Sequence, residues 1–131
     1  MQKQRIILVE DDPTVSDIIP ILLKRNGYEV TEFVACVPVL QQLKQFPHLF
    51  ILDFQLVDDD ALEVCRHFKN YSNTAEVPLV FLSATPDFEV KACKAGANAF
   101  IGKPFTSRHL LNTIRELIET AEMQKFNSSR H

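Results

Sequence analysis

The stretch LFILD at residues 49–53 guides the interpretation of the whole sequence. Its first four residues are apolar without interruption, which is typical of a strand covered on both faces, and its fifth is Asp53. Two further runs have the same character, RIILV at residues 5–9 and PLVFL at residues 78–82. Together the three runs predict the centre of a parallel sheet.

Two weaker patterns extend this sheet to five strands. YEVTEF at residues 28–33 alternates apolar and polar residues, and AFI at residues 99–101 is short, as strands near a sheet edge can be. Helical periodicity and helix-ending residues predict helices over Pro13–Arg25, near Pro38–Gln45, over Asp60–Lys69, from Thr85–Pro86 to just before Gly96, and from Thr106 or Ser107 to about Met123. Strand and helix alternate five times, which predicts a three-layer, doubly wound α/β fold.

Several details of these helices are separate predictions. Pro20 is expected to bend the first helix, and Asp60 to cap the third. In the fifth helix the expected core stripe is Leu110, Ile114, Leu117 and Ala121, with Leu111, Ile118 and Met123 outside it. Residues 1–123 are expected to form one domain, and residues 124–131 a flexible tail or the start of a linker.

Composition narrows the possible functions. The chain has 131 residues, 46% of them hydrophobic, and a formal net charge of -3, so direct nucleic-acid binding is not expected. The apolar runs are too short to span a membrane, and we expect a cytoplasmic protein. The three cysteines and four histidines show no spacing typical of a metal site or a disulfide framework.

Polar residues follow the apolar runs where each predicted strand ends. Glu10, Asp11 and Asp12 follow the first run, and Asp53 ends the run at 49–53. The last two strands are followed by Ser83 and by Lys103 with Pro104. Because ligands of open α/β sheets bind beyond the carboxyl ends of the strands, we expect these side chains to converge.

Clustered carboxylates repel one another, and a divalent cation would offset that repulsion. Hard oxygen ligands with open positions favour Mg²⁺ (or Mn²⁺) over zinc. A carboxylate nucleophile, a divalent cation and a lysine are together what an aspartyl-phosphate site requires. As an alternative for Asp12 alone, Asp12–Pro13 could simply cap the first helix.

At these residues the sequence closely resembles the receiver domain of two-component response regulators. ILVEDDP at residues 7–13, FILDFQL at 50–56, PLVFLSA at 78–84 and GANAFIGKPF at 96–105 are similar to the signature stretches of that family, in order. The resemblance implies a flavodoxin-like (βα)5 fold with strand order 2-1-3-4-5. It also implies a regulator rather than an enzyme that turns over an external substrate.

The resemblance assigns roles by position. Asp53 would accept a phosphoryl group from a histidine kinase or a phosphotransfer protein. Asp12, Asp53 and the backbone carbonyl of Gln55 would hold the metal, with Asp11 acting through metal-bound water. Ser83 and Phe100 would form the switch, Lys103 would pair with the phosphate, Lys103–Pro104 would be a cis peptide, and Gln55 and Thr85 would tune dephosphorylation. The output would be a changed surface of the fourth helix, fifth strand and fifth helix, with possible dimerisation on activation.

The chain departs from the family pattern beside the acceptor, where Val57, Asp58 and Ala61 replace the usual proline and glycines. A receiver fold used as a docking module with little or no switching therefore stays an alternative, as does a fragment of a larger regulator or hybrid kinase. An aspartate-nucleophile phosphohydrolase would need an acid where Gln55 stands. A flavodoxin-like cofactor binder would need a phosphate-cradling loop where three acids follow the first strand.

Overall fold

A computed structural model describes residues 3–10, 18–34, 46–54, 59–71 and 74–128. Its strands are β1 (Arg5–Glu10), β2 (Glu29–Val34), β3 (Leu49–Asp53), β4 (Leu79–Ser83) and β5 (Ala99–Gly102). Its helices are α1 (Ile19–Arg25), α3 (Asp59–Asn70), α4 (Glu89–Lys94), which follows a 3-10 turn at Pro86–Phe88, and α5 (Ser107–Ser128). The helix expected near Pro38–Gln45 lies outside the described residues.

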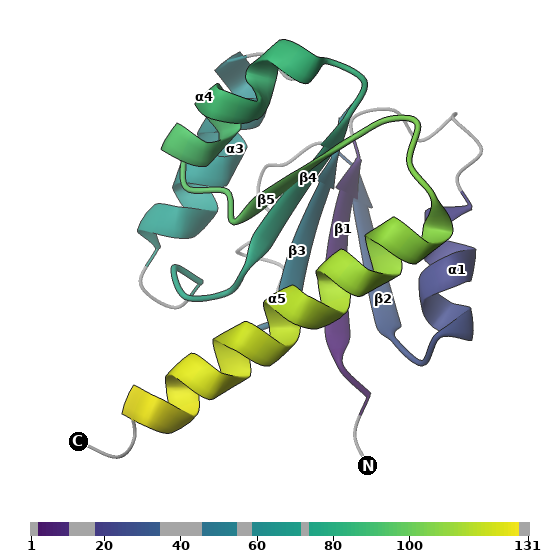
Figure 1. Ribbon diagram of the computed structural model, residues 1–131. Helices are drawn as coiled ribbons and strands as arrows, with labels where there is room; N and C mark the ends of the chain where they lie inside the picture. The colour runs from purple at the N-terminus through teal and green to yellow at the C-terminus, as the bar shows by residue number, and fades with distance from the viewer. Residues whose placement is uncertain (1–2, 11–17, 35–45, 55–58, 72–73, 129–131) are drawn as a thin grey trace.

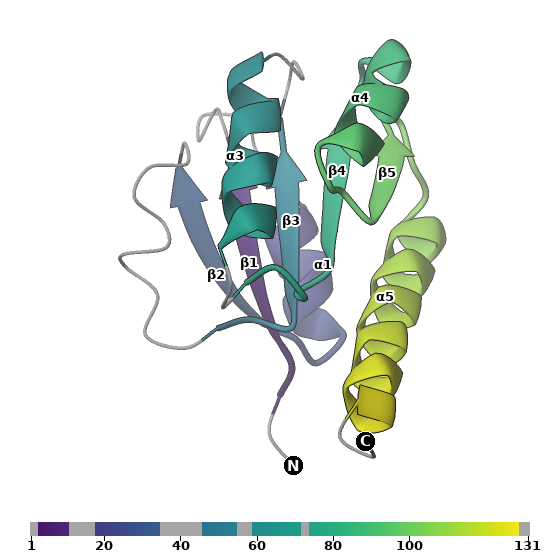
Figure 2. The same cartoon turned by 90° about the vertical axis from the view of Figure 1, so that its left-hand side faces the viewer.

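The strands form one parallel sheet of order β2-β1-β3-β4-β5, which confirms the predicted topology. Helices α1 and α5 cover one face and α3 and α4 the other (Figure 1, Figure 2). Strands β1, β3 and β4 are buried along almost their whole length, whereas β2 at the edge is mostly exposed. The uninterrupted apolar runs therefore occupy the centre of the sheet, because both of their faces are covered.

Two separate apolar clusters result, one on each side of the sheet. On the α1/α5 side, Leu110, Ile114 and Ile118 of α5 pack against β1, β3 and β4 residues. On the α3/α4 side, Phe50 of β3 stacks on Phe68 of α3 with ring centroids 4.2 Å apart. No helix in the described part of the chain is long and apolar enough to cross a membrane.

The structure corrects four expectations about the helices. Pro20 stands in the first turn of α1, where its missing N–H costs no helical bond, so it does not bend the helix. Helix α3 begins at Asp59, which places Asp60 inside the helix rather than at its cap. Ile118 belongs to the buried stripe of α5, while Leu117 is only partly buried. Helix α5 continues to Ser128, past the expected end near Met123.

Glycines end two helices as their positions predicted. Gly27 after α1 has φ +91° and Gly96 after α4 has φ +111°, backbone conformations that other residues adopt only at a cost. Around Gly96 the chain turns sharply into β5, and a Cβ added to this glycine would lie 2.8 Å from Cγ of Lys69. Helix α3 and the α4–β5 turn are therefore in close contact at this point.

Candidate functional site

Asp53 is the last residue of β3 and lies at the carboxyl edge of the sheet, where all five parallel strands end (Figure 1). Its side chain is 8% exposed. Lys103, which follows β5, donates a hydrogen bond from Nζ to Oδ1 of Asp53 over 2.5 Å. The Lys103 side chain is 27% exposed, so one partner of this ion pair reaches water.

The end of β4 lies between these two residues and holds them in place. Ser83 is fully buried, and its backbone carbonyl accepts a hydrogen bond from the backbone N–H of Lys103 over 2.8 Å. The Ser83 hydroxyl oxygen accepts a bond from the backbone N–H of Thr85 over 3.1 Å. The structure thus brings Asp53, Ser83 and Lys103 to one edge, as the sequence analysis expected, and Thr85 lies beside Ser83.

Phe100 lies on β5, paired in register with Phe81 of β4. Its ring is half-buried and packs against the cluster beneath α3 and α4. The peptide bond between Lys103 and Pro104 is cis, the conformation expected for it. Phe100 therefore lies on the buried side of the edge strand β5, and Lys103 directly follows that strand.

Glu10 is the acidic residue that sequence reasoning did not select as a ligand. It ends β1 and is the register partner of Asp53, and it is 9% exposed. The signal was present in the sequence, because two adjacent parallel strands that each end in an acid must bring those acids together. Asp11, Asp12 and Gln55, which were selected, lie outside the described residues, so their geometry stays a prediction.

The donor chemistry of this edge fits a hard divalent cation. Glu10 and Asp53 supply carboxylate oxygens from neighbouring strands, and no histidine or thiol competes at these positions. Within the described residues no group of three or more potential ligands is assembled. A complete metal site would need the acids that follow Glu10.

Comparison with known proteins identifies the family of this chain. A family model described as response regulator receiver domain matches residues 6–115. The chain is 32% identical over 120 residues to the transcriptional regulatory protein GltR of Pseudomonas aeruginosa, covering 89% of this chain and 50% of GltR. It is 29% identical over 118 residues to the phosphate regulon transcriptional regulatory protein PhoB of Escherichia coli, covering 88% and 52%. The chain thus spans about half the length of these curated relatives.

Solved structures show the same fold. A putative response regulator from Chloroflexus aurantiacus superposes with a TM-score of 0.80 at 26% identity, covering 90% of this chain and 99% of that one. The receiver domain of sensor histidine kinase PA1611 from Pseudomonas aeruginosa gives a TM-score of 0.78 at 26% identity, with the same coverage. That structure is described with a magnesium ion coordinated in the active site cleft.

Proposed function

Since this chain belongs to the family of response regulator receiver domains of two-component systems, we propose that it accepts a phosphoryl group on Asp53 and signals by protein contact. The observation that carries the proposal is the buried Asp53 carboxylate with the Lys103 ammonium 2.5 Å from it. The donor would be a histidine kinase or a histidine phosphotransfer protein. The chain would act by contact in the cytoplasm, without turnover of an external substrate.

In the transfer step, one Asp53 oxygen attacks phosphorus in line while the bond from phosphorus to the donor's imidazole nitrogen breaks. The electron pair of that bond leaves with the imidazole, which takes up a proton. Lys103 supports the step by neutralising negative charge on the transferring group. The backbone of Lys103 is anchored beside the site, because its N–H donates to the carbonyl of Ser83.

A bound Mg²⁺ would neutralise charge on the phosphoryl oxygens during transfer. We propose that Asp53 and Asp12, with the backbone carbonyl of Gln55, hold this cation, and that Asp11 acts through water. The register of β1 and β3 adds Glu10 to the acids that face it. Mn²⁺ prefers similar ligands and is an equivalent cation for experiments.

The response would begin at the hydroxyl of Ser83. Once phosphate is present, this hydroxyl could donate to it, and Phe100 would move inward on the adjacent strand. Movement along β5 would then change the surface formed by α4, β5 and α5, where a downstream protein, an output domain or a second copy would bind. Gln55 and Thr85 would set how fast the acyl phosphate hydrolyses.

Intact mass spectrometry tests this function. Incubation with phosphoramidate and Mg²⁺ should add the mass of one phosphoryl group, and the Asp53→Asn variant should gain none. Asp87→Asn is the matched control, since Asp87 is an exposed aspartate in the turn before α4, and it should be phosphorylated normally. Failure of the parent protein to gain mass with a competent donor and Mg²⁺ would contradict the proposal. Amide spectra with and without beryllofluoride then separate switching from constitutive docking, which would leave the α4–β5–α5 face unchanged.

A further inference from the structure

Lys69, near the end of α3, is a half-buried lysine that has only neutral hydrogen-bond partners among the described residues. Its Nζ donates to the carbonyl of Val77 over 3.0 Å and to Oδ1 of Asn98 over 3.1 Å. Within the described residues Lys69 forms no ion pair. Burial therefore disfavours the ammonium without an opposite charge to offset it, and it lowers the pKa of Lys69 below its usual 10.5.

The position of this amine is fixed by further contacts. Oδ1 of Asn98 also accepts the backbone N–H of Leu79 over 3.0 Å, which holds the acceptor in place. Cγ of Lys69 lies against Gly96, where an added Cβ would be 2.8 Å away. A neutral lysine amine has two N–H bonds, so it can keep its hydrogen bonds to Val77 and Asn98 and still present a lone pair in the remaining direction. The geometry thus suits a nucleophilic amine.

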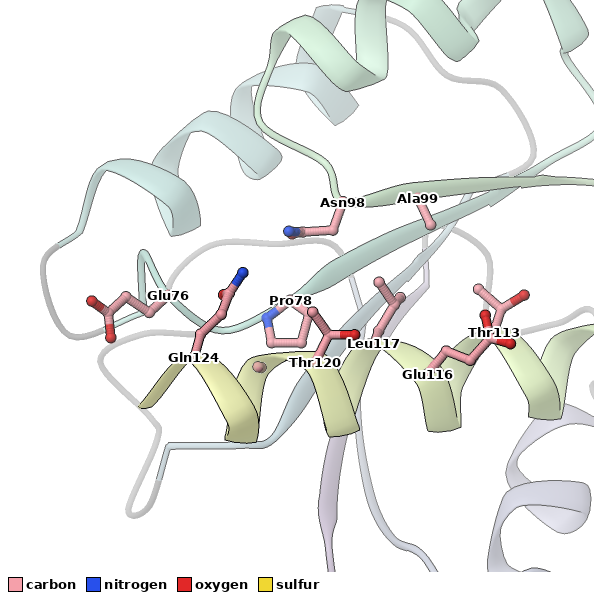
Figure 3. Close-up of a pocket in the computed structure, with 10 residues that line it drawn as sticks. Glu76, Pro78, Asn98, Ala99, Thr113, Glu116, Leu117, Thr120 and Gln124 are labelled. Atoms are coloured by element: carbon pink, nitrogen blue, oxygen red, sulfur yellow. The ribbon is translucent and has the colours of Figure 1, made fainter. Parts of the chain in front are cut away.

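Lys69 lines a cavity of about 550 Å³. This cavity adjoins the one of about 310 Å³ shown in Figure 3, and both are lined by Glu76, Asn98, Ala121 and Gln124. In Figure 3 the Asn98 side chain is directed toward Glu76 and Gln124. The cavity beside Lys69 is larger than a small acyl compound such as acetyl phosphate, so a compound of that size can enter it.

The groups around Lys69 do not cancel the effect of its burial. A deprotonated Cys65, one turn earlier on α3, would raise the pKa of Lys69, but burial raises the pKa of the Cys65 thiol itself to about 11, so this thiol is neutral near pH 7. Glu76, before β4, and Lys125 of α5 line the same cavity, and both are exposed to solvent, which screens their charges. The turn at residues 95–98 contributes no titratable side chain.

From these observations we propose that Lys69 is a modification site that accepts an acyl group from small activated acyl compounds, the acyl phosphates and thioesters. The neutral Nζ attacks the carbonyl carbon of the donor, and a nitrogen–carbon bond forms. The bond from that carbon to the phosphate oxygen or to the sulfur breaks, and its electron pair leaves with the phosphate or the thiolate. The leaving group takes up, through water, the proton that the amine gives up.

Acylation weakens the link between α3 and the turn that leads from α4 into β5. The product is an uncharged amide with one N–H, so it can keep only one of the two hydrogen bonds, to Val77 or to Asn98. Gly96 packs against the same side chain, so the turn loses part of its support. The reaction does not involve Asp53.

Site-resolved acetylation of the folded chain tests the proposal. The protein is incubated with acetyl phosphate in EDTA, which withholds the cation proposed for transfer to Asp53, and peptide mass spectrometry follows each lysine from about pH 7 to about pH 10. Near neutral pH, Lys69 should react at least about threefold faster than Lys94, an exposed lysine of α4, and its rate should level off at a lower pH. Lys125, which lines the same cavity but is exposed, should behave like Lys94. Concentrated urea should make the three lysines equal.

Asn98→Asp is the most informative variant, because it keeps the Oδ1 acceptor and gives it a negative charge that stabilises the ammonium. It should slow the acetylation of Lys69 about tenfold near neutral pH and leave Lys94 unchanged. Asn70→Asp is the matched control, since it adds the same charge at the next residue of α3, which is exposed. Adjacent residues of a helix do not face each other, so this control should change the Lys69 rate by less than about twofold.

The proposal is overturned if Lys69 reacts no faster than Lys94 near neutral pH, if the two rates share one pH dependence, or if Asn98→Asp leaves the Lys69 rate unchanged. Equal rates at Lys69 and Lys125 would also contradict it, because access to the cavity alone would then explain the reaction. A second series replaces acetyl phosphate with acetyl-CoA, and faster reaction of Lys69 with either donor supports the proposal and identifies the donor class. The comparison of lysines within the parent protein does not depend on the folding of a variant, and none of these outcomes depends on whether Asp53 accepts phosphate.

Discussion

The ion pair between Asp53 and Lys103 connects β3 and β5, two strands separated in the sheet by β4. Breaking a buried pair leaves a desolvated charge, although the partial exposure of Lys103 reduces the cost. We expect Lys103→Met to lower the free energy of unfolding by about 1–3 kcal/mol, whereas Lys94→Met, on the exposed surface of α4, should change it little. Urea denaturation measures both.

A double-mutant cycle isolates the interaction energy between Asp53 and Lys103 from the effects that each substitution has on its other neighbours. Asp53→Asn removes the buried charge, so adding Lys103→Met to it should cost less than Lys103→Met alone. The coupling between the two sites should be on the order of 1–2 kcal/mol. Additive effects would show that the contact contributes nothing to stability.

His48 gives the stability a pH dependence. Its Nδ1 accepts the backbone N–H of Arg5 over 2.9 Å, and burial, with Arg5 and Lys125 opposing Glu122, lowers the pKa of His48 below its usual 6.5. The unfolded chain therefore binds a proton more readily, so this contribution is full above pH 6.5 and is lost as the pH falls through the folded pKa. Asparagine can still accept the Arg5 N–H without titrating.

We accordingly expect the free energy of unfolding to decline less steeply from pH 6.5 downward in His48→Asn than in the parent protein. His109→Asn, which changes an exposed histidine at the start of α5, is the control and should keep the parent slope. Urea denaturation across this range gives the comparison. An unchanged slope in His48→Asn would assign the pH dependence to other groups.

At the scale of elements, the turn between α4 and β5 depends on Gly96 in two ways. Its φ is +111°, and a Cβ there would meet Lys69, whose ammonium is fixed by two hydrogen bonds and cannot easily withdraw. Gly27 has a similar φ but nothing within 4 Å of an added Cβ. Gly27→Ala should therefore cost about 1 kcal/mol, and Gly96→Ala at least about 1 kcal/mol more.

The same pair of glycines tests the cause of that difference. A Lys69→Ala background removes Cγ, 2.8 Å from the added Cβ, but keeps Cβ of residue 69 at 3.1 Å, so the extra cost of Gly96→Ala over Gly27→Ala should shrink without vanishing. Thermal or urea unfolding of the variants would show it. An extra cost of the same size with and without the Lys69 side chain would show that the contact with Cγ contributes nothing to it.

Helix α5 has two adjacent apolar residues, Leu117 and Ile118, whose contributions to the core can be compared directly. Ile118 is almost fully buried, whereas Leu117 is partly exposed. Ile118→Ala should cost about 3 kcal/mol because it leaves a cavity, and Leu117→Ala less than half of that. Equal losses would mean that both residues contribute to the core. Denaturant unfolding, with the slope checked for two-state behaviour, measures these costs.

At the scale of the whole molecule, cation binding should be visible as added stability. If Mg²⁺ binds only the folded chain, a concentration 100 times its Kd stabilises the fold by about 2.7 kcal/mol. We expect the melting temperature to rise with Mg²⁺, to return after chelation, and to respond little in Asp53→Asn. An equal rise in that variant would place the cation away from Asp53.

The central strands could be predicted because a sheet covered on both faces leaves uninterrupted apolar runs. The convergence of Asp53, Ser83 and Lys103 followed from parallel strands ending at one edge, and the strand order came from family resemblance. Ile118 was assigned wrongly because Leu117 and Ile118 are both at helical spacing from Ile114, and only packing against the sheet distinguishes them.

Other features depend on information that local sequence does not contain. Adjacent aspartates are equally suited to cap a helix, so the sequence predicts Asp60 as the cap of α3, whereas the helix begins at Asp59. The nearness of Glu10 to Asp53 depends on the register of two strands.

The length of α5 has a mechanical consequence. Its last buried side chain is Ile118, and none of the residues from Glu119 to Phe126 is buried, although the helix runs on to Ser128. At 1.5 Å per residue the 22-residue helix is about 33 Å long, and roughly 12 Å of it, from Glu119 to Phe126, carries no buried side chain. If α5 tilts by about 5° about the end nearest Lys103, its far end is displaced by about 3 Å. Small changes in the angle of α5 at the phosphoryl site would therefore cause their largest displacement at the C-terminal end of the helix.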